Sequence, residues 1–215
     1  MADIYTEKAE LRRQIISAAR IYKRYLAGKT FLYVYGDKYF EVAFLKSRFK
    51  HLTGVLSCLN GETFYEEACL AHLSDGQFWF SKEHPLKAAK KKAVVLQGIQ
   101  AITNSPVCVL IDFQTNTVVY KLGITDLNFT IGLVENTDKN TGEKINDWML
   151  PMTLRVKDKS IEKSKNAETI DFIFSKDARN DTVYTTVCYA EKGVAMPETI
   201  RHLIAPEIYS AEAKK

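Results

Sequence analysis

Residues 31–44, FLYVYGDKYFEVAF, contain two extended runs around a short polar segment. The runs at 31–35 and 39–44 are rich in aromatic and β-branched residues, which favour strands. The Gly-Asp-Lys segment at 36–38 is typical of a tight hairpin turn. We therefore predict an antiparallel pair of strands at this point of the chain.

The chain before this hairpin predicts one long helix, from about Thr6 to Ala27. Its apolar residues recur at steps of three or four and form one face: Leu11, Ile15, Ala18, Tyr22 and Leu26. Gly28 is a stop signal for this helix. The opposite face is basic, which is typical of a solvated surface and also suits a phosphate backbone.

After the hairpin, helices are predicted at 63–73 and 86–103, with a short one at 197–210. From residue 107 onward, short apolar or alternating runs bounded by turn residues predict strands. They lie at 107–113, 117–122, 128–134, 149–156, 169–174 and 182–190. Polar residues 135–147 are expected to form an exposed loop, and the charged residues 157–165 a short helix or a loop.

Helices followed by strands of this kind predict an α+β fold, with N-terminal helices packed on one face of a curved antiparallel sheet. We expect a single domain over residues 1–215, with a core at about 10–190 and a disordered tail at 211–215.

The composition is that of a globular protein, with 46% hydrophobic and 26% charged residues in a chain of 215. The net charge of +4 permits nucleic-acid binding without requiring it. The four cysteines form no CxxC pair, so reduced thiols are expected rather than a zinc site. The sequence contains no signal peptide and no apolar run of membrane length, which predicts a cytoplasmic protein with no membrane partner.

Several enzyme classes are disfavoured because their motifs are missing. The sequence contains no P-loop, no GxGxxG, no GxSxG and no HExxH. Kinase, NTPase, dinucleotide-binding and α/β-hydrolase activities are therefore poor fits, and we expect no metal and no cofactor.

The segment after the hairpin, residues 44–55, groups the side chains best suited to chemistry. Lys46, Arg48, Lys50 and His51 fall within six residues. Fixed positive charges bind a phosphodiester and stabilise the charge that develops on it, while an imidazole moves protons near neutral pH. Metal-free RNA cleavage, in which a 2′-hydroxyl attacks its own phosphate, uses this set of groups. The alternative is a structural histidine beside one solvated helical face.

A second basic group lies at the start of the helix predicted at 86–103, where Lys87, Lys90 and Lys91 share one side. Such a face is typical of a solvated surface and also suits a phosphate backbone, which makes Lys87 and Lys91 candidate phosphate-binding residues. The other histidines have weaker surroundings, and His72, beside apolar residues, is expected to be structural.

Several segments, taken in order, resemble one known family. They are Phe49–Val55 with its F-x-H-L-T-G core, Phe64-Tyr65, the lysine-led helix with Leu96 and Ile99, Leu150–Leu154, Ile170–Phe174, and the strand with Tyr184. Over about residues 10 to 190 this order resembles the fourth group of phage-type barnase/EndoU/colicin/RelE-like nuclease domains.

The resemblance implies an RNase-like fold and metal-independent RNA cleavage. It implies that His51 is the general acid or base, and that Thr53 orients His51 or the substrate. Phosphate binding would fall to Lys46, Arg48 and Lys50. Thr153 would match a catalytic position that often carries a small hydroxyl residue after proline, and Arg155 and Tyr184 would supply a second proton donor or clamp from the sheet. One departure is that Met152 and Val156 surround Thr153 with apolar bulk.

Three functions fit these features. The first is a phage or mobile-element ribonuclease, whose partner is RNA. The second is a catalytically inactive nuclease-like scaffold that binds a host nucleic-acid-processing protein, for example as an inhibitor of a CRISPR-type defence nuclease. The third is an RNA-binding module. His51 distinguishes them, because only the enzyme requires it for cleavage of RNA.

Overall fold

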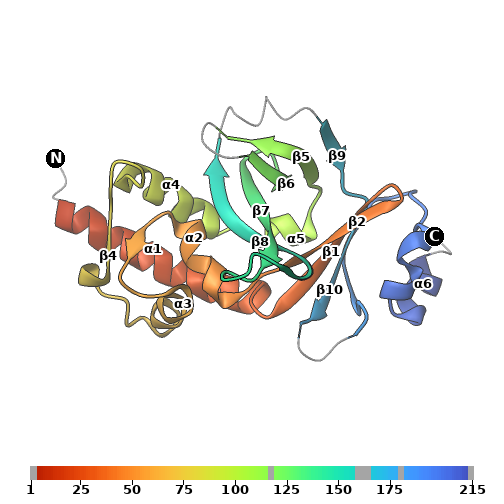
Figure 1. Cartoon of the computed structure of the whole chain (residues 1–215), viewed down its shortest axis with the longest axis horizontal. Helices are drawn as coiled ribbons and strands as arrows, with labels where there is room; N and C mark the ends of the chain where they lie inside the picture. Colours follow the sequence, from red (N-terminus) through yellow and green to blue (C-terminus); the bar gives the residue numbers. More distant parts are fainter. Residues whose placement is uncertain (1–3, 116–118, 158–165, 179–181, 213–215) are drawn as a thin grey trace.

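The computed structural model describes residues 4–115, 119–157, 166–178 and 182–212. The helices are α1 (Ile4–Tyr25), α2 (Phe49–Thr53), α3 (Gly61–Leu70), α4 (Leu86–Leu96), α5 (Ala101–Asn104) and α6 (Pro206–Glu212). Three 3-10 turns accompany them: η1 (Lys46–Arg48), η2 (Asp75–Gln77) and η4 (Glu198–Leu203). Figure 1 shows α1 to α4 on one side of a large curled sheet and α6 on the other.

The strands are β1 (Lys29–Tyr35), β2 (Lys38–Ala43), β3 (Leu56–Ser57), β4 (Phe78–Trp79), β5 (Cys108–Gln114), β6 (Val119–Thr125), β7 (Phe129–Thr137), β8 (Lys144–Val156), β9 (Asn166–Thr169), β10 (Phe172–Asp177) and β11 (Thr186–Ala190). Nine of them form one sheet in the order β11-β10-β1-β2-β8-β7-β6-β5-β9, and β3 pairs with β4 separately. The expected α+β fold with a curved, mostly antiparallel sheet is confirmed.

The hairpin and the long helix formed as predicted. β1 and β2 pair in antiparallel register around a turn closed by Tyr35 and Lys38. The five apolar residues of the α1 stripe are all fully buried: Leu11, Ile15, Ala18, Tyr22 and Leu26. The helix periodicity therefore identified the face of α1 that packs on the sheet.

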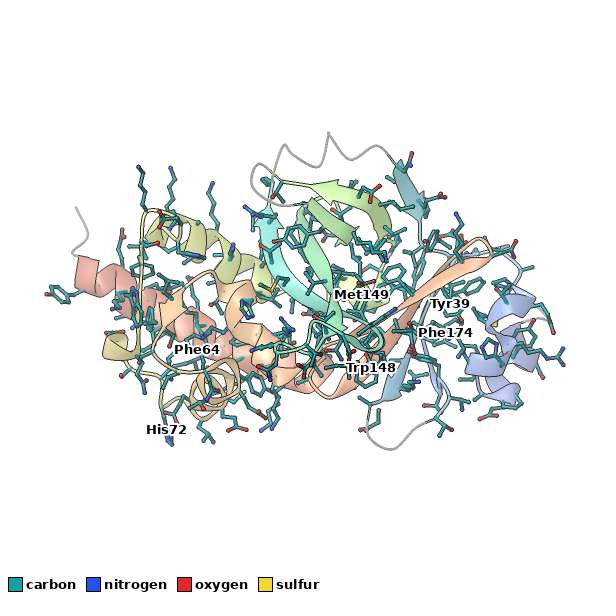
Figure 2. The ribbon with its side chains drawn as sticks, in the orientation of Figure 1. Tyr39, Phe64, His72, Trp148, Met149 and Phe174 are labelled. Atoms are coloured by element: carbon teal, nitrogen blue, oxygen red, sulfur yellow. The ribbon has the colours of Figure 1, made fainter. Side chains whose placement is uncertain are left out.

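Only two residues, Ile170 and Asp171, connect β9 at one edge of the sheet to β10 near the other. Because two residues span about 10 Å at most, the sheet must curl until its edges approach each other. The curl encloses the main core, which Ile131, Leu133 and Leu154 line from β7 and β8. Near the middle of the sheet, β2 and β8 pair in parallel, the one parallel pair among the described strands, where Trp148 and Met149 lie beside β2 (Figure 2).

Alternate residues of β1 face two different cores. Phe31 and Tyr33 belong to the main core with the helices, whereas Leu32 and Val34 belong to a second cluster. That second cluster is covered by the C-terminal segment, through Met196, Ile200 and Ile204. The sheet is thus apolar on both faces at β1 and β10. The main core with the helices buries one face, and the C-terminal segment buries the other.

Residues 135–147 were expected to form an exposed loop, and this prediction is wrong. β7 extends to Thr137 and β8 begins at Lys144, so that these residues form a β-hairpin. Its turn is closed by Asp138, whose carboxylate accepts hydrogen bonds from the backbone amides of Asn140 and Thr141 at 2.8 and 3.0 Å. Because this hairpin projects from the core, most of its side chains are polar, and the sequence therefore lacks the apolar pattern from which strands are predicted.

Three further boundaries differ from expectation. The helix expected at 86–103 is broken, because i→i−3 hydrogen bonds tighten the chain at Gly98 and Ile99 before α5. In the strand expected at 182–190, only β11 is regular, and Tyr184 forms an isolated bridge to Ile204. Helix α6 extends through residues 211 and 212 of the expected disordered tail.

Some expectations fall on residues that the structure does not describe. These are the start of the strand expected at 117–122, most of the segment 157–165 and the tail residues 213–215. Among the described helices, none combines the length and the apolar character needed to span a membrane.

Candidate functional site

His51 lies on α2, a short helix that directly follows η1. Phe49 and Leu52, on the other side of this helix, are fully buried. The Phe49 ring packs against Tyr22 and Tyr65, with centroid distances of 5.3 and 5.8 Å. Because helical geometry turns residue 51 away from these two anchors, the His51 side chain is exposed.

Two of the predicted site residues, Lys50 and Thr53, hold this segment in place, and a third, Lys46, forms a weaker contact. Lys50 Nζ donates a hydrogen bond to the Leu59 carbonyl at 2.7 Å. The Thr53 hydroxyl, fully buried, donates to the Lys50 carbonyl at 2.7 Å. Lys46 Nζ lies 3.2 Å from Glu66 Oε1 in an exposed ion pair, which contributes little stability. The structure therefore directs the polar groups of Lys50 and Thr53 into backbone contacts.

Glycine is required at two positions beside α2. Gly54 ends the helix in the left-handed conformation, with φ of 76°. Gly61, the first residue of α3, packs on η1 so closely that an added Cβ would lie 2.2 Å from the Ser47 carbonyl oxygen. Asn60 fixes the start of α3 by accepting hydrogen bonds from the amides of Glu62 and Thr63. The start of α3 thus sets the position of η1 and of the α2 segment after it.

Replacing Gly61 with alanine is expected to lower the free energy of unfolding by about 2 kcal/mol, because the backbone of η1 must move to admit the methyl group. The His51 imidazole resonances should shift as well. Gly76→Ala is the matched control, since a Cβ at Gly76 would meet nothing within 4 Å. Urea unfolding and NMR spectra of the histidine side chains measure both effects. Equal stability and unchanged His51 resonances in both variants would contradict this account of Gly61.

The surroundings of His51 are basic. Although the residue is exposed overall, partial desolvation of its imidazole lowers the pKa of His51, and the charges of Arg48, Lys50 and Lys139 lower it further. Within the described residues, His51 has no hydrogen-bond partner and no carboxylate ion pair. Arg48 is partly buried, and its guanidinium lies 3.6 Å from the Met152 sulfur on β8. The imidazole is therefore predominantly neutral at pH 7 and able to accept a proton.

Sequence reasoning missed Lys139. It lies in the turn of the β7–β8 hairpin, 88 positions after His51. No local pattern could have identified it, because only the pairing of β7 with β8 brings this turn towards α2.

A second group of cations lines a pocket of about 400 Å³ between the start of α4 and the end of β8. Its walls are formed by Pro85, Lys87, Ala88, Lys91, Lys92, Leu154, Arg155, Val156 and Lys157. The predicted residues Lys87, Lys91 and Arg155 thus come together, although they are separated by more than 60 positions. Lys90, which was expected to share their side of the helix, instead lies 3.4 Å from Glu7 on α1.

Lys92 connects this pocket to α2. Its aliphatic chain packs so closely on Gly54 that an added Cβ there would lie 2.8 Å from Lys92 Cδ. Burial, together with the neighbouring charge of Arg155, lowers the pKa of Lys92 to about 8. The sequence showed the run of lysines at 87–92, but it did not predict which of these lysines lie on the side of α4 that faces β8.

Thr153 lies on the outer face of β8, opposite Gly132, and is buried. Its neighbours across the strand pair, Ile131 and Leu133, point into the main core instead. A Cβ at Gly132 would meet the Thr153 methyl group at 2.8 Å. Thr153 is therefore packed closely within the sheet.

Tyr184 lies in the second cluster, on the face of β1 and β10 that the C-terminal segment covers. Its hydroxyl donates a hydrogen bond to Glu41, and Lys176 Nζ lies 4.4 Å from the centroid of its ring. Burial, with the hydrogen bond to Glu41, raises the pKa of Tyr184. Since α2 packs on the main core, the structure does not bring Tyr184 to His51.

The remaining described histidines offer no comparable site. His72 was expected to be structural, but it lies exposed beyond the end of α3, at the outer edge of the molecule in Figure 2. His84 and His202 are exposed too. Within the described residues, no group of three His, Cys, Asp or Glu side chains could hold a metal ion.

Comparison with known proteins identifies one related family. The family model described as phage-Barnase-EndoU-ColicinE5/D-RelE like nuclease4 matches residues 14–192. No curated protein and no solved structure matches the chain. The matched range contains α2, the pocket between α4 and β8, and the whole of the large sheet. The curled α+β architecture is consistent with a barnase/RelE-like nuclease fold.

Proposed function

This chain belongs to the fourth family of phage-type nuclease domains that resemble barnase, EndoU, colicins E5 and D, and RelE, and from this nuclease-like character we propose that it cleaves RNA without a metal ion, with His51 as general base. The observation that carries the proposal is the state of His51. The residue is exposed, and partial desolvation of its ring together with the neighbouring cations lowers its pKa, which favours the neutral imidazole at pH 7.

The proposed step is an internal transfer within the RNA. His51 accepts the proton of a 2′-hydroxyl, and the 2′-oxygen then attacks the adjacent phosphorus. The bond from phosphorus to the 5′-oxygen breaks, and that oxygen takes a proton from water. The products are a 2′,3′-cyclic phosphate and a 5′-hydroxyl end.

Arg48 and Lys139 are the cations proposed to stabilise the phosphorane-like transition state. Both act on His51 electrostatically, and neither has a carboxylate partner among the described residues. A cation held near the developing negative charge favours the transition state over the ground state. Lys46 and Lys50, bound to Glu66 and to the Leu59 carbonyl, are less available for this role.

An oligonucleotide assay tests the proposal directly. Wild-type protein in EDTA is expected to cleave single-stranded RNA and to leave 2′,3′-cyclic phosphate ends. The same oligonucleotide with 2′-deoxyribose at every position should remain intact, because the attacking hydroxyl is missing. Cleavage of both strands, or loss of RNA cleavage when EDTA is added, would refute the mechanism.

One observation favours a second candidate, a nuclease-like scaffold that binds without cleaving. No described residue forms a hydrogen bond to His51, so none of them orients its imidazole for proton transfer. On this alternative the basic surface binds RNA or a host nucleic-acid-processing protein, such as a CRISPR-type defence nuclease. RNA that binds to wild-type protein and stays intact under every condition would favour this candidate.

A further inference from the structure

The pocket between α4 and β8 contains more positive charge than its described lining residues neutralise. Among the nine described residues that line it, five are cations: Lys87, Lys91, Lys92, Arg155 and Lys157. This described lining includes no Asp or Glu. Like charges gathered in one pocket destabilise the folded protein unless an anion is bound there.

Two of these cations are poorly solvated. Arg155 Nε is buried and has no hydrogen-bond partner in the described part of the chain. Lys92 has no ion pair or hydrogen bond to any described residue, and its charge opposes that of Arg155. A buried donor without a partner costs free energy, since it loses water and gains nothing in return. A purely solvated lysine face would explain Lys87 and Lys91, but not the partly buried Lys92 or the buried Nε of Arg155.

The N-terminus of helix α4 also favours a bound anion. It begins after Pro85 with no capping side chain and no acidic residue in its first turn. Lys87 lies in this first turn instead, where the helix dipole already places partial positive charge. The sequence of α4 therefore disfavours its own N-terminus in the absence of a negatively charged ligand.

We propose that this pocket binds a phosphate group of the nucleic acid, with the partly buried Lys92 and Arg155 as its inner ligands and Lys87, Lys91 and Lys157 around its mouth. The proposal rests on the proposed function and identifies a subsite for it. The pocket volume of about 400 Å³ is sufficient for a nucleotide. Because Lys92 packs on Gly54, three residues after His51, a strand held here can also pass α2.

Binding of inorganic phosphate tests the subsite without requiring RNA cleavage. At constant ionic strength, phosphate at ten times its dissociation constant should raise the melting temperature of wild-type protein by about 4 °C relative to chloride. Lys92→Met should melt higher than wild type in chloride, because one of two opposed charges is gone, and should show no phosphate shift. Arg155→Met should likewise lose the shift.

Lys90→Met is the matched control, since Lys90 lies on the same helix but pairs with Glu7. It should keep the wild-type phosphate shift, as should His51→Ala. This last variant separates the two proposals, because a failure of catalysis at His51 leaves phosphate binding intact. No shift in wild type, or an equal shift in Lys92→Met, would overturn the subsite.

Short oligonucleotides identify the source of the phosphate. A trinucleotide with a 5′-phosphate that binds at least tenfold more tightly than its 5′-hydroxyl counterpart would assign the pocket to a terminal phosphate. Equal binding of the two, lost in Lys92→Met, would assign it to an internal phosphodiester. Equal binding that Lys92→Met does not weaken would contradict the proposal.

Discussion

His51→Ala is expected to lower kcat/KM for RNA cleavage by about 10²–10⁴-fold, the usual contribution of a general base. The free energy of unfolding should change little, because the side chain is exposed and forms no hydrogen bond with a described residue. His72→Ala is the matched control, since His72 is also exposed but lies beyond α3. Cleavage rates and urea unfolding of the three proteins measure the effect.

The pH dependence of cleavage gives a second measure of the same group. The pKa of His51 is lowered from 6.5, so the base is deprotonated and active above that lowered value. Cleavage should therefore rise with pH below 6.5 and be level near pH 7. Lys139→Gln removes one of the lowering charges and should move the rising limb towards higher pH.

These two results can fail separately. Full activity of His51→Ala would exclude His51 as the base, whatever the pH profile. A rising limb that Lys139→Gln leaves in place would show that the turn of the β7–β8 hairpin does not act on the reacting group.

Ile200→Asp is expected to lower the free energy of unfolding by about 4 kcal/mol or more. Ile200 is fully buried in the second cluster, against residues of β1 and β10. A carboxylate there would lie among the apolar side chains of the cluster, and the apolar contacts of the isoleucine are lost. The melting temperature should fall by about 10 °C or more, which calorimetry measures.

His202→Asp is the matched control, because His202 is exposed on the same turn, η4. It should change the free energy of unfolding by no more than about 0.5 kcal/mol. Similar stability of both variants would show that the C-terminal segment does not stabilise the sheet. The result bears on the family as well, since residues 193–212 lie beyond the matched range yet cover one face of its sheet.

Local patterns predicted the elements whose burial follows from near neighbours. The alternation in residues 31–44 identified the β1–β2 hairpin, and the spacing of apolar residues identified the buried face of α1. The same reasoning failed for residues 135–147, where polar side chains cover a hairpin that projects from the core. It also failed for the helix expected at 86–103, which ends when tighter turns begin at Gly98.

In the candidate site, too, the sequence predicted some features, and others depended on tertiary packing. Lys46, Arg48, Lys50 and His51 were found together because they are close in sequence. Their separate roles were not visible, since the contacts of Lys50 with the Leu59 carbonyl and of Arg48 with Met152 depend on packing. Tyr184 followed from the resemblance alone, and the curl of the sheet leaves it on the opposite face from α2.

By itself, the sequence determined the α+β class, the first hairpin, the stripe of α1 and the basic segment that bears His51, because helix and strand periods and short spacings are properties of the local chain. Only the tertiary structure decided that Lys139 approaches His51 and that Lys92 and Arg155 share one pocket. Their proximity depends on strand order, sheet curl and helix packing. These are set by the burial of the whole core, and no local segment encodes them.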